Sequence, residues 1–245
     1  MNLFKKGINV FLILSALVPA VSCCWIPSVV DGNKIIVDNE MDISDYQEIR
    51  LSVAGKLTYR QEAGKSPYLK ISADENILPL LEVGVKGNRL SIGTKDRISV
   101  RLSQMTVETN STNLVGIDVA GSGKVHLAGE VKTGNMDMNI AGSGSITTDG
   151  LHCETTRLDI AGSGKIQLNG SCRKVSGTIS GSGDIEAFDY YVENWNCHIA
   201  GSGNMNIRAS EELKINIAGS GKIRYMGNPK ISSNIAGSGS IKQLP

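Results

Sequence analysis

Two aspartates, Asp118 and Asp159, each stand one aliphatic residue before a recurring Ala-Gly-Ser-Gly motif. Paired carboxylates are the groups that glycoside cleavage requires. The two copies lie two repeats apart, so stacked strands would separate these carboxyl groups by roughly 10 Å, slightly more than such a pair needs. Asn139 holds the position between them, where a lyase would need Arg or Lys. We therefore predict no catalytic residues and no enzyme, with a carbohydrate-active lyase or hydrolase-like β-helix protein as the alternative.

Histidine and cysteine stand next to each other twice, as His152-Cys153 and Cys197-His198. Neither pair has the cysteine spacing of a structural zinc site, and alternation along a strand would point Cys197 inward and His198 outward. Calcium-binding β-roll repeats place Asp after their glycines and recur every nine residues, unlike this motif. We predict no metal and no cofactor.

The Ala-Gly-Ser-Gly motif could be mistaken for a phosphate loop or a nucleophilic serine. A phosphate loop opens a helix, and no copy is followed by a helical pattern. The Gly-x-Ser-x-Gly nucleophile motif is absent. Seven copies indicate a structural turn, and they start at Ala120, Ala141, Ala161, Ser180, Ala200, Ala218 and Ala236.

The copies start 18 to 21 residues apart, a period typical of solenoids, in which each repeat buries its apolar face against its neighbours. The residue before each copy and the second residue after its last glycine are aliphatic or Met in all seven repeats. Glycine lets the chain turn between these two core positions. Such coils are too short for a strand plus a long helix, and a leucine-rich consensus is absent. The pattern predicts an all-β fold, a parallel β-helix with coils of about 18–21 residues.

A second position in each repeat is polar and would point outward by alternation. Stacked coils would align these side chains in an outer ladder, formed by Asp118, Asn139, Asp159, Thr178, His198, Asn216 and Asn234. One residue earlier the side chains are mostly apolar, which predicts that Cys197 is a core residue.

Three cysteines follow residue 24, and two of them, Cys153 and Cys172, are 19 residues apart. This separation is close to one period, so the pair could stack on adjacent coils and form a disulfide. Two small buried thiols are an equally good interpretation.

Aromatic residues gather between Ala187 and Asn196. Aromatic rings stack on sugars, so Tyr190, Tyr191 and Trp195 form a candidate ligand patch. The alternative is a bulge whose rings cover the edge of a coil.

The N-terminus has the pattern of an export signal over residues 1–22. Lys5 and Lys6 precede a short apolar run, and small residues lead to Cys23, as in a bacterial lipobox. We predict lipidation of Cys23 and anchoring in a membrane of the cell envelope, with simple secretion as the alternative. Loss of residues 1–22 changes the net charge from +1 to about −1, a balance that does not suggest nucleic acid as partner.

The rest of the chain divides into a tether and first strand over 23–40 and one β-solenoid domain over 41–245. Residues 41–115 are predicted to be divergent coils, and 116–245 are the regular repeats. Val53–Leu57 looks like a shortened copy of Val119–Val125, and residues 74–81 could make one short helical turn.

These features together resemble the putative auto-transporter adhesin, head GIN domain family, which comprises exported proteins of Bacteroides-type bacteria. The resemblance rests on Tyr46–Val53 (Tyr-Gln-Glu-Ile-Arg-Leu-Ser-Val), on Leu90-Ser91-Ile92 and on the serial Ala-Gly-Ser-Gly motif, and it covers roughly 42–240. It implies a right-handed parallel β-helix, and it carries no binding residues over to this chain.

We therefore expect a non-enzymatic, adhesin-like or structural module that presents an extended surface in the cell envelope. Its expected partners are an envelope or surface protein or glycan, and the membrane through the lipid anchor. Self-assembly through the end coils, giving a homo-oligomeric scaffold, is a further alternative.

Overall fold

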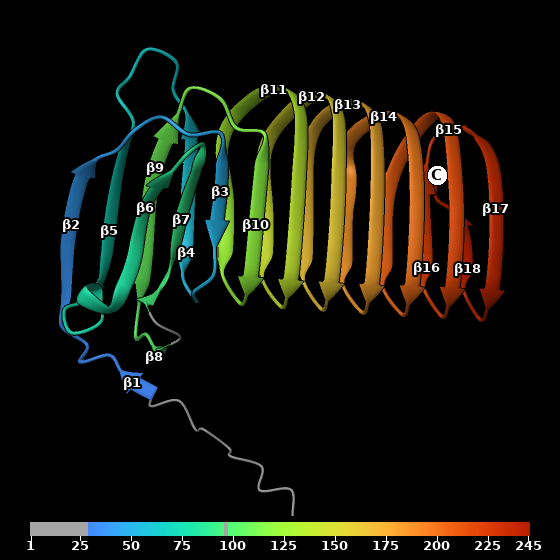
Figure 1. Ribbon diagram of the computed structural model, residues 1–245. Coiled ribbons are helices and arrows are strands. Elements are labelled where there is room, and N and C mark those ends of the chain that lie inside the picture. The colour runs from blue at the N-terminus through green and yellow to red at the C-terminus, as the bar shows by residue number, and fades with distance from the viewer. Residues whose placement is uncertain (1–28, 96–97) are drawn as a thin grey trace, which may run out of the picture.

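A computed structural model describes residues 29–95 and 98–245, and it shows a nearly all-β chain with a solenoid of about six turns (Figure 1). The predicted fold class is thus confirmed. The predicted export signal and Cys23 lie outside the described residues. No helix within the described ranges is long and apolar enough to cross a bilayer.

The regular repeats form the long part of the solenoid, in which one bent strand makes up most of each coil. Every strand pairs in parallel with its counterpart on the next coil, as Figure 1 shows. The strands are β10 (Gly116–Gly121), β11 (Lys124–Gly142), β12 (Ser145–Gly162), β13 (Lys165–Gly181), β14 (Asp184–Gly201), β15 (Asn204–Gly219), β16 (Lys222–Met226), β17 (Lys230–Gly237) and β18 (Ser240–Gln243).

The Ala-Gly-Ser-Gly motif forms the corner at which each coil turns, and its two glycines are required for different reasons. The first glycine, such as Gly162, has a φ of 127°, a backbone conformation that residues with a Cβ rarely adopt. The second, Gly164, has no unusual φ, but a Cβ there would lie 2.5 Å from Ile140 Cγ2 on the preceding coil. The corner serine lies between them with its side chain exposed. The corner therefore lets successive coils approach until their backbones touch.

The aliphatic positions beside the corners form the core, as predicted. Twelve of the fourteen are buried, with at most 2% of their surface exposed. The other two, Ile235 and Ile241, belong to the last coil, onto which no further described strand packs. Ile231 of the same coil is also exposed. The outer edges of β17 and β18 are thus unpaired within the described residues, and self-assembly through them stays a prediction.

The N-terminal part continues the sheet but changes its pairing. It contains β1 (Val29–Asp31), β2 (Ile36–Asp42), β3 (Glu48–Leu51), β4 (Lys56–Gln61), β5 (Tyr68–Asp74), β6 (Leu81–Lys86), β7 (Arg89–Thr94), β8 (Ser99–Arg101), β9 (Met105–Ser111) and the 3₁₀ turn η1 (Leu78–Leu80). Strands β3 and β4 pair in parallel with β10 and β11, whereas β2, β5 and β6 pair antiparallel. The helical turn expected within 74–81 is confirmed by η1.

One antiparallel pair, β6 with β7, arises where the chain turns back directly, whereas β5 pairs antiparallel with β2 and β9, which are distant from it in sequence. Strands β6 and β7 are joined by Gly87 and Asn88, with Gly87 at φ 62°. Two-residue connections with a glycine at positive φ are typical of antiparallel hairpins. These strands extend the sheet beyond β3 and β4 at the N-terminal end of the solenoid (Figure 1).

The proposed shortened copy of the repeat at Val53–Leu57 is half right. Lys56 and Leu57 do pair with Lys124 and Val125. Upstream, however, Leu51 and not Val53 pairs with Val119. The N-terminal corner therefore has the same length as the others, and Gly55 alone retains a glycine of the motif because Val53 stands in the place of Gly121.

The corner geometry predicts the effect of adding one methyl group. Gly164→Ala should lower the free energy of unfolding by about 1–3 kcal/mol, because its Cβ would overlap Ile140 and overpacking of this kind is costly. Chemical denaturation followed by far-UV circular dichroism measures this effect. Ser163→Ala, one residue away on the exposed side of the corner, should change stability by at most about 0.5 kcal/mol. Equal effects of the two variants would contradict the close-approach explanation.

Candidate ligand-binding face

The strand segments that lead into the corners carry three outward rows of side chains, which together we call the polar face. Alternation points every second residue outward, and the parallel register places equivalent residues next to each other on successive coils. The first row is Asn135, Thr155, Lys174, Asn194, Glu212 and Lys230; the second is Asp137, Arg157, Ser176, Asn196, Lys214 and Ser232.

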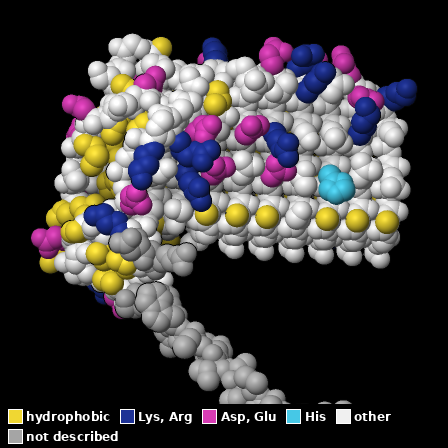
Figure 2. All heavy atoms as spheres, in the orientation of Figure 1, with side chains coloured by type: hydrophobic (Ala, Val, Ile, Leu, Met, Phe, Trp, Pro, Cys, Tyr) yellow, Lys and Arg dark blue, Asp and Glu magenta, His cyan; other side chains and the backbone are white. Residues whose placement is uncertain are grey.

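The third row is the ladder predicted from the sequence. Register pairs connect all seven members, from Asp118 through Asn139 and Asp159 to Asn234. Figure 2 shows the array from this side, with charged side chains of both signs among uncharged ones and a line of small hydrophobic side chains running beside them.

Each of the two ladder aspartates accepts a hydrogen bond from a different neighbour, Asn139 of the same ladder or Arg157 of the second row. Asn139 Nδ2 donates a hydrogen bond to Asp118 Oδ1 at 2.9 Å. Arg157 Nε donates to Asp159 Oδ2 at 2.7 Å. Arg50 on β3 stands beside Asp118 and extends the ladder by one coil in the N-terminal direction. The carboxylates are thus bound to different partners rather than facing one another.

A groove of about 660 Å³ crosses strands β12 to β15 on the polar face. Its outward walls come from the first and second rows. Three cationic side chains line it, Arg157, Lys174 and Lys214, against one acid, Glu212. The uncharged polar members are the side chains of Thr155, Thr156, Ser176, Asn194 and Asn196, and Val175 and Trp195 add apolar surface to the lining.

The charges of the groove are only partly neutralised. Lys214 Nζ lies 3.1 Å from Glu212 Oε2, and Arg157 uses its Nε on Asp159. Within the described part of the chain, Lys174 has no ion-pair partner among the salt bridges. Cations that lack a protein partner are available to an anionic ligand.

The groove residues were missed by the sequence analysis, although the signal was present. The ladder was traced at one position per repeat, and the first and second rows stand four and two residues before it. If the same alternation is followed two and then four residues upstream of the ladder, it predicts both rows. It could not have found the groove, because the shape of the face depends on how each strand bends.

The aromatic ligand patch expected at 190–195 is wrong for two of its three members. Tyr190 is fully buried and Trp195 has 2% of its surface exposed, whereas Tyr191 has 59%. Trp195 lies in an inward row beside Gly177, whose missing side chain leaves the space that the indole ring fills. Its Nε1 donates a hydrogen bond to Arg208 O at 3.0 Å. Tyr190 likewise stands next to Gly170 on the preceding coil.

The cysteines occupy two different environments. Cys153 and Cys172 pair in register on β12 and β13, so their predicted stacking is correct. Both are free thiols in the structure, and a disulfide between them stays a prediction. Cys197 is fully buried between Gly177 and Ile215 in the core row, as expected. Among the described residues, no cluster of three or more His, Cys, Asp or Glu side chains could hold a metal ion.

Comparison with known proteins places this architecture in a family. The sequence signature of the family described as "Putative auto-transporter adhesin, head GIN domain" matches residues 45–229. No curated protein matches the chain.

Three solved structures are similar over almost the whole chain. One from Bacteroides fragilis, described as a putative adhesin, is 26% identical with a TM-score of 0.80, covering 88% of this chain and 100% of that one. One from Parabacteroides merdae, also described as a putative adhesin, is 26% identical with a TM-score of 0.73, covering 89% and 99%. One from Parabacteroides distasonis, described as a putative lipid binding protein, is 31% identical with a TM-score of 0.74, covering 89% and 100%.

The position of Trp195 can be tested by fluorescence. In a Trp25→Phe background Trp195 is the single tryptophan, and we expect short-wavelength emission with weak quenching by acrylamide because the ring is buried. Trp195→Ala should lower the free energy of unfolding by about 3–5 kcal/mol, as for other large core side chains. Long-wavelength emission with strong quenching would show that Trp195 is exposed and would support the aromatic ligand patch.

Proposed function

The chain belongs to the head GIN domain family of adhesin-like proteins, and on this premise we propose that it is a non-enzymatic binding module of the cell envelope or cell surface that holds an anionic glycan on its polar face. The family and the adhesins among its structural relatives support an exported protein with a binding role. The groove across β12 to β15 is the observation that carries the ligand class.

Its charge favours an anionic ligand. Three cations and one acid give the lining a net positive charge, while the whole chain is close to neutral. Because Arg157 is paired with Asp159 and Lys214 with Glu212, the unpaired charge of the groove within the described residues is that of Lys174. Carboxylate or sulfate groups would pair with Lys174 and Lys214 by charge-assisted hydrogen bonds.

The repetition of the face favours a polymer. Hydroxyl and amide groups recur from coil to coil at the spacing of neighbouring parallel strands, about 4.8 Å. Thr155, Ser176 and Asn196 can all form hydrogen bonds with sugar hydroxyls. A chain of repeating sugars lying along the solenoid axis would meet a similar set of groups on every coil, so that many weak contacts add up.

A lipid ligand is less well supported by this groove. One relative is described as lipid binding, and anionic lipid headgroups share the charge of acidic sugars. An acyl chain needs an extended apolar wall, however, and here only two of the lining side chains, Val175 and Trp195, are apolar, among charged, hydroxyl and amide groups. The core beneath is filled with the buried aliphatic rows.

Sugar cleavage is the alternative that the aspartates would have to carry. Asp118 accepts a hydrogen bond from Asn139, and Asp159 accepts one from Arg157. Asn139 also stands between the two aspartates in the ladder. Acid and base must face the same bond from opposite sides. This arrangement supports binding rather than hydrolysis.

Binding can be measured with polygalacturonic acid as the anionic probe and its fully methyl-esterified form as the neutral one. We expect binding of the acid form, weakened by salt, and about tenfold loss of affinity, or about 1.4 kcal/mol, in Lys174→Gln/Lys214→Gln. Lys165→Gln/Lys222→Gln removes the same charge from exposed positions after the corners and should bind as the parent does. Equal losses in both variants, or binding to anionic vesicles alone, would contradict the proposal.

We further propose that Cys23 carries a lipid that anchors the module to an envelope membrane. The motivation is the short apolar run followed by small residues and a cysteine. Cys23→Ser should release the protein from the membrane fraction of the producing cells, while Cys24→Ser should leave it bound. Retention of the Cys23→Ser variant in the membrane fraction would exclude this anchor.

A further inference from the structure

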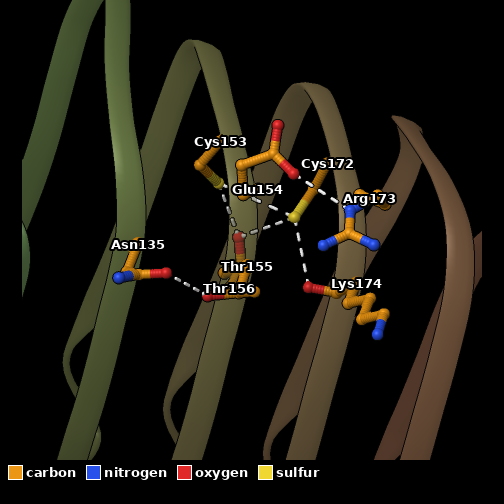
Figure 3. A network of polar contacts seen from close by, with 8 residues as sticks. All are labelled: Asn135, Cys153, Glu154, Thr155, Thr156, Cys172, Arg173 and Lys174. Carbon is orange, nitrogen blue, oxygen red and sulfur yellow. Dashed lines mark hydrogen bonds and ion pairs between the residues drawn. The ribbon is translucent and has the colours of Figure 1, made fainter.

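Cys153 and Cys172 form a close thiol pair outside the polar face. They are register partners on β12 and β13, and their sulfur atoms lie 3.7 Å apart (Figure 3). Neighbouring strands are about 4.8 Å apart, which is within the Cα separation that disulfides span. A small rotation of the side chains is enough to join them.

The pair has polar neighbours, which distinguishes it from a structural core thiol. Thr156 Oγ1 lies 2.9 Å from Cys153 Sγ and 3.4 Å from Cys172 Sγ. Tyr190 Oη lies 3.2 Å from Cys153 Sγ and 2.9 Å from Thr156 Oγ1. Two hydroxyl groups, those of Thr156 and Tyr190, thus lie against the pair of sulfurs, and Figure 3 shows the contacts of Thr156. Cys197 provides the internal contrast, since it is fully buried and its thiol forms no hydrogen bond within the described residues.

This network sets the two thiols apart in acidity. A hydrogen bond from the Cys153 thiol lowers the pKa of Cys172, helped by Thr156, because these donors stabilise the thiolate. The same bond and burial raise the pKa of Cys153. Burial raises the pKa of Cys197, which keeps that thiol protonated. Thiolates are the reactive form of cysteine.

Solvent reaches the pair mainly at Cys153, since Cys172 has 5% of its surface exposed. A second groove, of about 430 Å³, is lined by both cysteines together with Tyr191, Arg173 and Arg208. Cys153 is half-buried at its wall. Arg208 lies 4.7 Å from the centre of the exposed Tyr191 ring and shapes the opening. Arg173 is paired with Glu154 at 2.9 Å, so the rim carries both signs of charge.

We propose that Cys153 and Cys172 form a thiol–disulfide exchange site that reacts with organic disulfides and closes to a reversible bridge between adjacent coils. Cys172 Sγ attacks one sulfur of the disulfide RSSR, whose S–S bond breaks and releases one RSH after protonation. Cys153 Sγ, having given up its proton, attacks Cys172 Sγ and releases the second RSH. Counted from two thiols, one of which has already lost its proton to solvent as the Cys172 thiolate, the protein loses two electrons and two protons, and RSSR gains both.

The reaction is tested on the full chain, reduced and then incubated with oxidised glutathione at neutral pH. Remaining thiols are blocked with N-ethylmaleimide and located by peptide mapping, which separates these positions from Cys23 and Cys24. We expect a Cys153–Cys172 disulfide with Cys197 still blocked as a thiol, at a rate about tenfold or more above any reaction of Cys197. Dithiothreitol should reverse it.

Variants resolve the order of the two steps. Cys153→Ser should stop at a stable glutathione adduct on Cys172, whereas Cys172→Ser should react slowly and Cys197→Ser as the parent does. Circular dichroism of each variant confirms that it is folded. The proposal is overturned if folded Cys153→Ser gains no adduct, if Cys197 reacts as fast as the pair, or if the parent forms mixed disulfides without closing the bridge.

Discussion

Backbone contact at the corners is the constraint on which the rest of this structure depends. From the corner at Ala141 onward, the first glycine leaves no room for a Cβ against the glycine carbonyl of the coil before, and the second leaves none against the aliphatic residue that precedes the corner of that coil. The regular coils can stack this closely in parallel register because both positions lack a side chain. Register then propagates outward from the corner along each strand, so that every core row and every surface row is fixed by the same contact.

Because this contact fixes the register, the side chains that stabilise the fold and the side chains that could bind a ligand belong to different rows. Inward rows are aliphatic and buried through six consecutive coils, which gives the solenoid one continuous core. Outward rows are free to vary, and they hold hydroxyl, amide and charged groups in lines along the axis. Departures from the aliphatic pattern inside the core are compensated locally, as when Trp195 fills the space beside Gly177. The antiparallel strands then extend the sheet at the N-terminal end of the stack, while the strand edges of the last described coil stay open.

Much of this architecture could be predicted because it repeats. The fold class, the core rows and the Asp118–Asn234 ladder all follow from one period and from alternation within it. The N-terminal pairing could not be predicted in the same way, since Leu51 and Gly55 occupy corner positions without the motif. Tyr190 and Trp195 were misjudged because their burial depends on glycines one coil earlier, at Gly170 and Gly177, which lie nearly twenty residues away in sequence. Grooves were out of reach for a related reason, because they arise from strand bending across several coils.

The central claim is that in-register stacking builds a face on which Lys174 and Lys214 contact an anionic glycan. Lysine acetylation footprinting, read by mass spectrometry with and without polygalacturonic acid, tests it most directly. We expect polygalacturonic acid to protect Lys174 and Lys214 from acetylation, with Lys165 and Lys222 modified at the same rate in both samples. Uniform protection of all four lysines, or protection of Lys165 and Lys222 alone, would contradict it.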